Sequence, residues 1–383
     1  MNAHSRAAQG GPLAGIRVIE VGHMLMGPYC AMLLADLGAQ VIKIEPPEGD
    51  IGRAISPHSI GPHNAYFASL NRSKESVVLD LASESGRRSL AALARDAHAL
   101  VTNLRPQAIR RLGLTYEHLR EFNERIVCVA LTGFGLDSPH ADLPAYDYVI
   151  QALTGIMNLT GDPGGPPTKA GYSAVDNSTG IMGAVGLLAK IVEGRGGQVD
   201  IAMFDVMVSQ LNYLAGAVLN GGETLVRHPL SSHPYIVPAQ LFKTRDDWLM
   251  VFITHDNFWR IFAQRVGRPE WVKQPGFATM AERRAHRPEV LAALSALFER
   301  ETTQHWLDCL ASSGVVVSRL ASIAEALASA QSEAREMVVE IESEAGPLKV
   351  VGNPVRIDGV RTRYGLPPLL GEHTAAWAAE VPT

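Results

Sequence analysis

Short apolar runs alternate with helically spaced apolar positions along the first 220 residues of the chain. Runs rich in β-branched residues predict strands at 16–21, 40–45, 76–81, 99–102, 126–131 and 198–203. Apolar residues that recur every three or four positions predict helices at 29–37, 85–96, 103–114, 148–159 and 204–219. Such alternation of strands and helices is typical of a parallel sheet covered by helices. We therefore predict a large α/β domain over residues 1–220.

The pattern changes near residue 221. Residues 221–240 are rich in loop-forming residues, and two strands are predicted around the turn at Asp246 and Asp247. Helical spacing then returns at residues 256–266, 288–300, 303–313 and 322–330. This grouping predicts a second, smaller α+β domain over residues 221–330. The remaining residues, 331–383, contain two strand-like segments.

The loop that follows the first predicted strand has the sequence GHMLMGP, residues 22–28. Ligands of open α/β sheets bind outside the carboxyl ends of the strands, so this loop is a candidate ligand contact. It lacks the G-x-G-x-x-G spacing of dinucleotide-binding proteins, which argues against that class. Residues 46–65, rich in Pro, Gly and His, are predicted to form a long loop.

Composition and charge exclude several classes of protein. With 46% hydrophobic and 19% charged residues, the chain resembles an ordinary soluble globular enzyme. The net charge of −5 argues against nucleic acid or an anionic membrane as the main partner. Three widely spaced cysteines, Cys30, Cys128 and Cys309, form neither a disulfide framework nor a metal-ligand pattern. The polar start has no signal-peptide core, so we expect a cytoplasmic protein without a membrane segment.

Asp176 lies at the centre of the most informative stretch, residues 166–206. The segment that follows it, residues 178–189, is rich in small residues and predicts a tightly packed helix. The carboxylate is then expected at or just before the positive end of a helix, where it stays ionised at neutral pH. On local sequence alone the residue fits an N-cap, a ligand or a nucleophile.

The segment VDNSTG, with GRGGQVDIAMFD some fifteen residues later, resembles the catalytic core of the family III CoA-transferases. This superfamily includes carnitine dehydratase-type CoA-transferases and acyl-CoA racemases. Further resemblance lies in order along the chain, at residues 16–50, 71–81, 100–119, 131–139 and 367–374. The resemblance implies a Rossmann-like large domain and an interlocked dimer of two ring-like protomers. It also implies that residues 331–383 return to the large domain.

The resemblance also assigns roles to individual residues. Asp176 matches the nucleophile, while Tyr146 and Asp147 match residues that line the active site. The implied contacts to coenzyme A, which is a substrate and not a cofactor, are Leu25, Met26, Leu79, Asn103, Leu104, Arg105 and Arg111. A solvated helix face is the alternative for the arginines, and for Arg110 in particular. An acidic protein needs a local basic patch to hold a polyanion, which favours the binding role.

Some positions depart from the family pattern. Pro46 and Ala82 stand where several members carry a basic residue that binds CoA. The sequence RHPLSSHPYIVP replaces the glycine run of formyl-CoA transferases near residue 230, which argues against formate or oxalate as substrate. His233 in that loop is a candidate contact for the acceptor acid, although loop histidines are more often structural.

We therefore expect a CoA-transferase that moves CoA from an acyl-CoA to a carboxylic acid through an aspartyl-CoA thioester. Succinyl-CoA is the candidate donor. One alternative is a 2-methylacyl-CoA racemase. It is disfavoured because Tyr146 replaces the histidine that serves as a base in that branch, and an unperturbed tyrosine has a pKa near 10. The other alternative is a non-catalytic acyl-CoA-binding protein.

Overall fold

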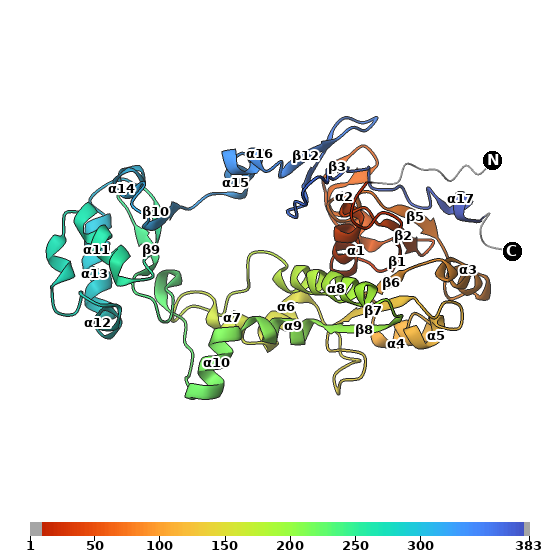
Figure 1. Ribbon diagram of the computed structural model, residues 1–383, viewed down its shortest axis with the longest axis horizontal. Coiled ribbons are helices and arrows are strands. Elements are labelled where there is room, and N and C mark those ends of the chain that lie inside the picture. Colours follow the sequence, from red (N-terminus) through yellow and green to blue (C-terminus); the bar gives the residue numbers. More distant parts are fainter. Residues whose placement is uncertain (1–9, 379–383) are drawn as a thin grey trace. The chain divides into compact units, whose positions relative to one another are not determined.

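Six parallel strands form the central sheet in the computed structural model, which describes residues 10–378. The strand order is β5-β2-β1-β6-β7-β8, and the first pair aligns Arg17 with Gln40. The strands are β1 Arg17–Val21, β2 Gln40–Glu45, β5 Glu75–Val78, β6 Ala99–Thr102, β7 Val127–Thr132 and β8 Gly197–Ala202. The predicted α/β fold with a parallel sheet is confirmed (Figure 1).

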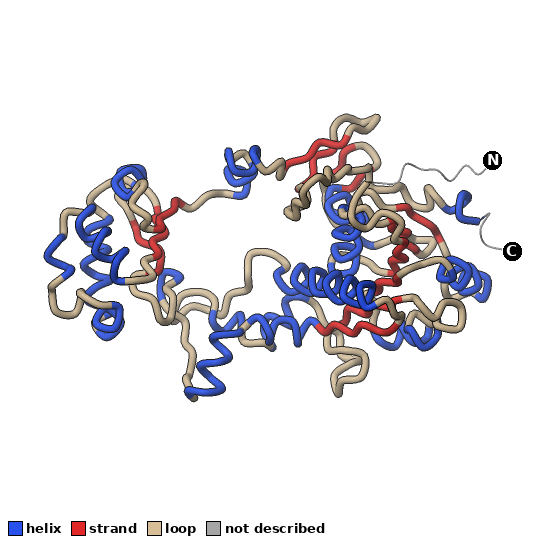
Figure 2. Tube along the Cα trace, viewed as in Figure 1, coloured by secondary structure: helices blue, strands red, loops and turns tan. Residues whose placement is uncertain are grey.

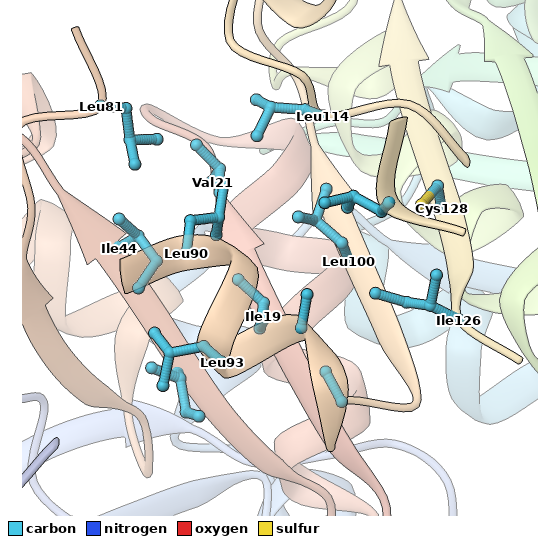
Figure 3. Packing of buried hydrophobic residues seen from close by; sticks show 14 of the residues in the cluster. Ile19, Val21, Ile44, Leu81, Leu90, Leu93, Leu100, Leu114, Ile126 and Cys128 are labelled. Carbon is cyan, nitrogen blue, oxygen red and sulfur yellow. The ribbon is translucent and has the colours of Figure 1, made fainter. Parts of the chain in front are cut away.

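Helices cover both faces of this sheet because successive strand side chains point to opposite sides. On one face, α3 (Glu84–Arg95), α4 (Pro106–Arg111) and α5 (Tyr116–Leu119) bury aliphatic side chains against the sheet. Figure 3 shows Leu90 and Leu93 of α3 beside Ile19, Ile44 and Leu100 of the strands. On the other face, α1 (Met26–Asp36) packs against α8 (Ala174–Glu193), and α8 also lies on β7 and β8.

The chain divides into two compact units. The first comprises residues up to Thr154, Ala170–Gly221 and the segment from Ser329 onward; the second comprises Gly155–Lys169 and Gly222–Ala328. An antiparallel sheet of order β11-β10-β9 forms the second unit together with α11 (Asp256–Arg265), η3 (Pro269–Val272), α12 (Met280–Ala285), α13 (Arg287–Phe298) and α14 (Thr303–Leu310). Its strands are β9 Ala239–Lys243, β10 Trp248–Phe252 and β11 Val316–Arg319. Its core is rich in aromatic residues, among them Trp259, Phe262 and Phe298.

The C-terminal segment from Ser329 onward is part of the first unit. Strands β12 (Val338–Ile341) and β13 (Leu348–Val351) form an antiparallel hairpin, drawn as red strands in Figure 2. Apolar side chains of this hairpin contact Ala68 of α2 (Ala65–Asn71). Further along, the His373 N–H donates to the Ser76 carbonyl at 2.9 Å, which attaches the start of α17 (Thr374–Ala378) to the edge strand β5.

Several predicted elements differ from the observed ones. The predicted loop at 46–65 contains a short 3-10 helix, Ile51–Ala54, and two-residue strands β3 (Ser59–Ile60) and β4 (His63–Asn64). The single helix predicted at 148–159 is two helices, α6 (Asp147–Leu153) and α7 (Ile156–Leu159), because Gly155 adopts φ 82°. The helix predicted at 204–219 is likewise divided, into α9 (Met203–Gln210) and α10 (Asn212–Gly221). Strand β11 and the short helix α16 (Ala330–Ala334) were not predicted, whereas α15 (Ile323–Leu327) lies within the helix predicted at residues 322–330.

No helix within residues 10–378 combines the length and the apolar character needed to cross a lipid bilayer.

Candidate active site

Asp176 is the third residue of α8 and is half-buried. The residue that precedes the helix is Ser173, and its side chain makes no capping hydrogen bond. The interpretation of Asp176 as an N-cap is therefore wrong, because its own backbone is already helical. The carboxylate nonetheless lies in the first turn of the helix, where the helix dipole favours negative charge.

Small residues explain how α8 reaches this position. A Cβ atom at Gly180 would lie 2.9 Å from the carbonyl oxygen of Met26, and one at Gly183 would lie 2.7 Å from Leu131 Cδ2. Neither position has room for a side chain, so the glycines let α8 pack closely on α1 and β7. The predicted tight packing of residues 178–189 is confirmed on this face of the helix.

Asp147, the first residue of α6, is brought next to Asp176. It is buried, and its Oδ2 accepts the N–H of Val175 at 2.8 Å and that of Asp176 at 3.4 Å. Its Oδ1 accepts the Nε2–H of Gln151 at 2.6 Å. The cap that α8 lacks at Ser173 is therefore supplied by a carboxylate from another helix. Tyr146, which precedes Asp147, is exposed.

The electrostatic setting of Asp176 is unusual for a surface carboxylate. Burial, and secondly the neighbouring charge of Asp147, raise the pKa of Asp176 to about 7. Neither aspartate forms an ion pair with a lysine, arginine or histidine among residues 10–378. The expectation that Asp176 stays fully ionised at neutral pH is therefore wrong. A carboxylate with a pKa near neutrality is typical of a reactive position.

Tyr66 is a further residue of this site that sequence reasoning missed. Burial, followed by the charges of Asp176 and Asp50, raises the pKa of the Tyr66 phenol to about 12, so it is a hydrogen-bond donor at every working pH. Helix α2 presents it, and the Asn64 side chain caps that helix by accepting the Tyr66 N–H at 3.0 Å. Asn64 before an apolar run is a helix-start signal, but nothing in the sequence places Tyr66 near Asp176.

The loop after β1 is held from two sides. The Asn103 side chain accepts the His23 N–H at 3.0 Å and donates to the His23 carbonyl at 2.9 Å. Asp50 Oδ1 accepts the Met24 N–H at 3.1 Å. Both polar atoms of the Asn103 side chain are thus used to hold the loop. The two predicted CoA contacts of this loop come next along the chain. Leu25 is the residue before α1, and Met26 is the first residue of that helix.

Buried charges lie beneath this loop. Lys43 Nζ is 2.7 Å from Glu20 and 2.8 Å from Asp50, and it also donates to the Gly22 carbonyl. Lys74 Nζ is 2.6 Å from the second oxygen of Glu20. Burial opposes the charge of Lys43, but Glu20 and Asp50 outweigh it and raise its pKa to about 12. Burial lowers the pKa of Lys74 to about 8 despite Glu20.

The other predicted CoA contacts lie at the ends of β5 and β6. Leu79 and Leu104 are half-buried and pack against the core of the sheet. Arg105 and Arg111 are exposed at the start and end of α4 and form no ion pair with another described residue. Arg110 differs, because it donates to the Leu136 carbonyl and lies 3.3 Å from Asp137. The CoA contacts themselves remain predictions.

His233 belongs to the second unit. Its Nδ1 accepts the N–H groups of Tyr235 at 3.1 Å and Ile236 at 3.2 Å, which closes a turn. Arg287 donates to the carbonyl oxygens of His233 and Pro234. The ring therefore has a structural role, while its contact with an acceptor acid remains a prediction. Within residues 10–378, no three His, Cys, Asp or Glu side chains are grouped to hold a metal ion.

Comparison with known proteins defines the class of enzyme to which this site belongs. The family model for CoA-transferase family III matches residues 13–374. The chain is 35% identical to acetyl-CoA:oxalate CoA-transferase of Acetobacter aceti, with 97% of this chain and 96% of that protein covered. It is 34% identical to succinate–glutarate CoA-transferase of Agrobacterium fabrum, with coverage of 97% and 96%. Human succinyl-CoA:glutarate CoA-transferase is 31% identical, with coverage of 97% and 86%. The chain belongs to CoA-transferase family III and is an enzyme of that class.

Solved structures agree with this assignment. A CAIB/BAIF family protein from Brucella suis superposes with a TM-score of 0.85 at 31% identity, covering 98% of this chain and all 100% of that one. The Mycobacterium tuberculosis protein Rv3272 also gives a TM-score of 0.85, at 26% identity, with coverage of 96% and 99%.

Proposed function

We propose that the protein transfers CoA from an acyl-CoA donor to a carboxylic acid, with Asp176 as the nucleophile. One observation carries the proposal: a half-buried carboxylate lies at a helix N-terminus with a pKa of about 7, beside a second carboxylate and without a cationic partner among residues 10–378. Because about half of such a group is ionised at pH 7, it combines an available anion with high basicity for a carboxylate.

We propose that the transfer proceeds in four steps. Asp176 attacks the thioester carbonyl of the donor, the C–S bond breaks, and CoA leaves as the thiolate from an acyl–aspartyl anhydride. The thiolate attacks the aspartyl carbonyl carbon of the anhydride, which releases the donor acid and leaves an aspartyl-CoA thioester. The acceptor carboxylate then attacks this thioester and expels the thiolate again. Attack of the thiolate on the acceptor's acyl carbon gives the new acyl-CoA and frees Asp176.

Two neighbours support this chemistry. The oxyanion formed at each attack needs hydrogen-bond donors, and the Tyr66 hydroxyl, whose pKa the charge of Asp176 helps to raise, is proposed as one of them. Arg105 and Arg111 are proposed to meet the phosphates of CoA, because both are exposed and neither pairs with a carboxylate in the part of the chain that the structure describes. A local basic patch of this kind is needed in a chain of net charge −5.

A dicarboxylic acid is the proposed acceptor. The names of the relatives mention oxalate, glutarate, succinate and mesaconate, each of which carries two carboxylates. We propose succinyl-CoA as the first donor to test, since it is the donor named for human succinyl-CoA:glutarate CoA-transferase. Oxalate belongs in the acceptor panel because an oxalate enzyme is 35% identical.

A screen of acyl-CoA donors against dicarboxylic acids, read by mass spectrometry of the acyl-CoA products, tests this function. We expect a new acyl-CoA only when donor, acid and enzyme are all present, and none with Asp176→Ala. Deuterium entering the α-carbon of a 2-methylacyl-CoA without any acid would instead indicate a racemase. Tight CoA binding with no product across the panel would indicate a binding protein.

We also propose that two protomers assemble. The outward side of α8 carries exposed Ile181, Met182, Val185 and Val192, spaced to form one stripe. A helix that is apolar on both its inward and outward sides is normally buried, and a patch of this kind marks an interaction surface. Light scattering is expected to report a dimer, whereas a monomer at micromolar concentration would contradict the assembly.

A further inference from the structure

Gln151 lies one helical turn after Asp147 on α6 and is fully buried. Its Oε1 accepts the N–H of Ala170 at 2.9 Å, and its Nε2 donates to Asp147 Oδ1 at 2.6 Å. Because the oxygen must face a backbone donor, the orientation of the amide is fixed and its NH2 group is directed at Asp147. Gln151 therefore has a single hydrogen-bonding arrangement in this position.

The contacts continue from Asp147 into α8. Its Oδ2 accepts the Val175 N–H at 2.8 Å and approaches the Asp176 N–H at 3.4 Å. Val175 is fully buried, so water does not offer its N–H a replacement acceptor. Ser173 makes no side-chain cap. The first turn of α8, which carries Asp176, is thus attached to α6 through one carboxylate whose other oxygen is held by Gln151.

We propose that Gln151 is a positioning residue for CoA transfer: it fixes the Asp147 carboxylate, which caps α8 and places Asp176 beside a stationary negative charge. The inference rests on the proposed function for its catalytic consequence, and on the hydrogen bonds above for its structural part. A nucleophile displaced by about 1 Å loses on the order of 100-fold in rate, so a residue without substrate contact can control turnover.

The charged groups around Asp176 make this arrangement testable through pH. Asp147 from α6 and Tyr66 from α2 are the titratable groups whose interactions with Asp176 appear among residues 10–378. Tyr29 of α1 and Asp205 of α9 interact with other groups instead. Moving the negative charge of Asp147 away therefore lowers the pKa of Asp176, and the acidic limb of the pH–rate profile moves to lower pH.

A charge exchange separates the hydrogen bonds from the charge. In Asp147→Asn, an amide NH2 faces the Gln151 NH2, and in Gln151→Glu, two carboxylates face each other, so each single variant breaks the contact. The double variant restores it: the new amide caps α8 and donates to the new carboxylate, which still accepts the Ala170 N–H. The charge then lies one side chain further from Asp176.

The experiment measures kcat/KM for CoA transfer from pH 5 to 9 in the wild type, both single variants and the double variant. Each single variant is expected to lose about 10- to 100-fold, and the double variant to recover most of that loss. Its acidic limb is expected at least about 0.5 pH unit below that of the wild type. A double variant no better than the worse single variant, or an unmoved limb, would overturn the proposal.

A second measurement does not depend on catalysis. Deuterium uptake of residues 171–180 is compared between the wild type and Gln151→Met, after circular dichroism confirms that both are folded. Faster uptake at the start of α8 supports the positioning role, and unchanged uptake overturns it. Absence of CoA transfer by the wild type would overturn the proposed function alone, because the uptake comparison still decides on the cap.

Discussion

Two groups of carboxylates, one beneath the loop after β1 and one at the start of α8, have opposite electrostatic environments. Beneath the first loop, Glu20 and Asp50 contact Lys43 directly, and although burial opposes it, Lys43 lowers the pKa of Asp50. At the start of α8, Asp147 and Asp176 lie together without a cation among the described residues, and the pKa of Asp176 is raised to about 7.

This difference distinguishes a carboxylate that holds the backbone in place from one that is suited to react. Where the carboxylate has a lysine partner it stays charged, and its oxygens accept backbone N–H groups such as those of Met24 and Gly52. At Asp176, burial and then the neighbouring carboxylate disfavour the charged form, so the oxygen is a stronger base. The two environments shift the pKa values of Asp50 and Asp176 in opposite directions, which fits a structural role for Asp50 and a reactive role for Asp176.

Removing the cation from the first group should have the largest effect. Lys43→Met leaves the buried carboxylate of Asp50 without its cation and is expected to lower the free energy of unfolding by about 3–5 kcal/mol. Urea unfolding at one fixed protein concentration measures it. The control is Arg88→Met, which breaks an exposed pair with Glu84 and should cost less than about 1 kcal/mol. Equal losses in the two variants would show that the buried lysine is not the compensating charge.

The second-largest effect is expected when the loop after β1 loses the Asn103 side chain that holds it. Asn103→Ala leaves the N–H and carbonyl of His23 without their partners, which costs about 1–3 kcal/mol. We expect the KM for acyl-CoA to rise about 10-fold, with a smaller change in kcat, because the loop carries predicted CoA contacts. Asn103→Asp keeps the acceptor for the His23 N–H, so its KM for acyl-CoA should lie between those of the wild type and Asn103→Ala. Unchanged steady-state kinetics in Asn103→Ala would exclude the loop from CoA binding.

Removing the negative charge of Asp176 should raise the free energy of unfolding instead of lowering it. The folded-state pKa of Asp176 lies above its ordinary value, so the folded protein binds the extra proton and stability falls as pH rises from about 4 to 7. Asp176→Asn removes this cost. After discounting for its partial exposure, we expect a gain of about 1–2 kcal/mol at pH 8 that disappears near pH 4. A pH-independent difference, or a loss at pH 8, would contradict the raised pKa.

The exposed arginines should show the smallest effects. Arg105→Ala and Arg111→Ala each remove one charge proposed to meet a CoA phosphate, and the KM for acyl-CoA is expected to rise about 3- to 10-fold. The effect should weaken at high ionic strength because both side chains are exposed. Arg110→Ala is the matched control, since Arg110 already donates to Leu136. The same KM increase in all three variants would indicate only a general loss of positive charge.

The sequence predicted the parallel sheet because its strands are buried on both faces and appear as continuous apolar runs, such as VCVAL in β7. It also singled out Asp176 and Asp147, through resemblance to a family. It did not predict the raised pKa of Asp176, because that shift arises from burial and from a contact between residues 29 positions apart. Gln151 and Tyr66 were missed for the same reason: their partners are set by tertiary structure, while their local sequences are ordinary.

The most direct test of the account is to find the covalent intermediate. Enzyme is incubated with acyl-CoA without an acceptor, quenched, digested and examined by mass spectrometry, with and without hydroxylamine. We predict CoA in thioester linkage on the peptide that contains Asp176, with conversion of that side chain to a hydroxamate by hydroxylamine. Full turnover in a parallel sample with acceptor, but with Asp176 unmodified or another residue labelled, would contradict the central claim.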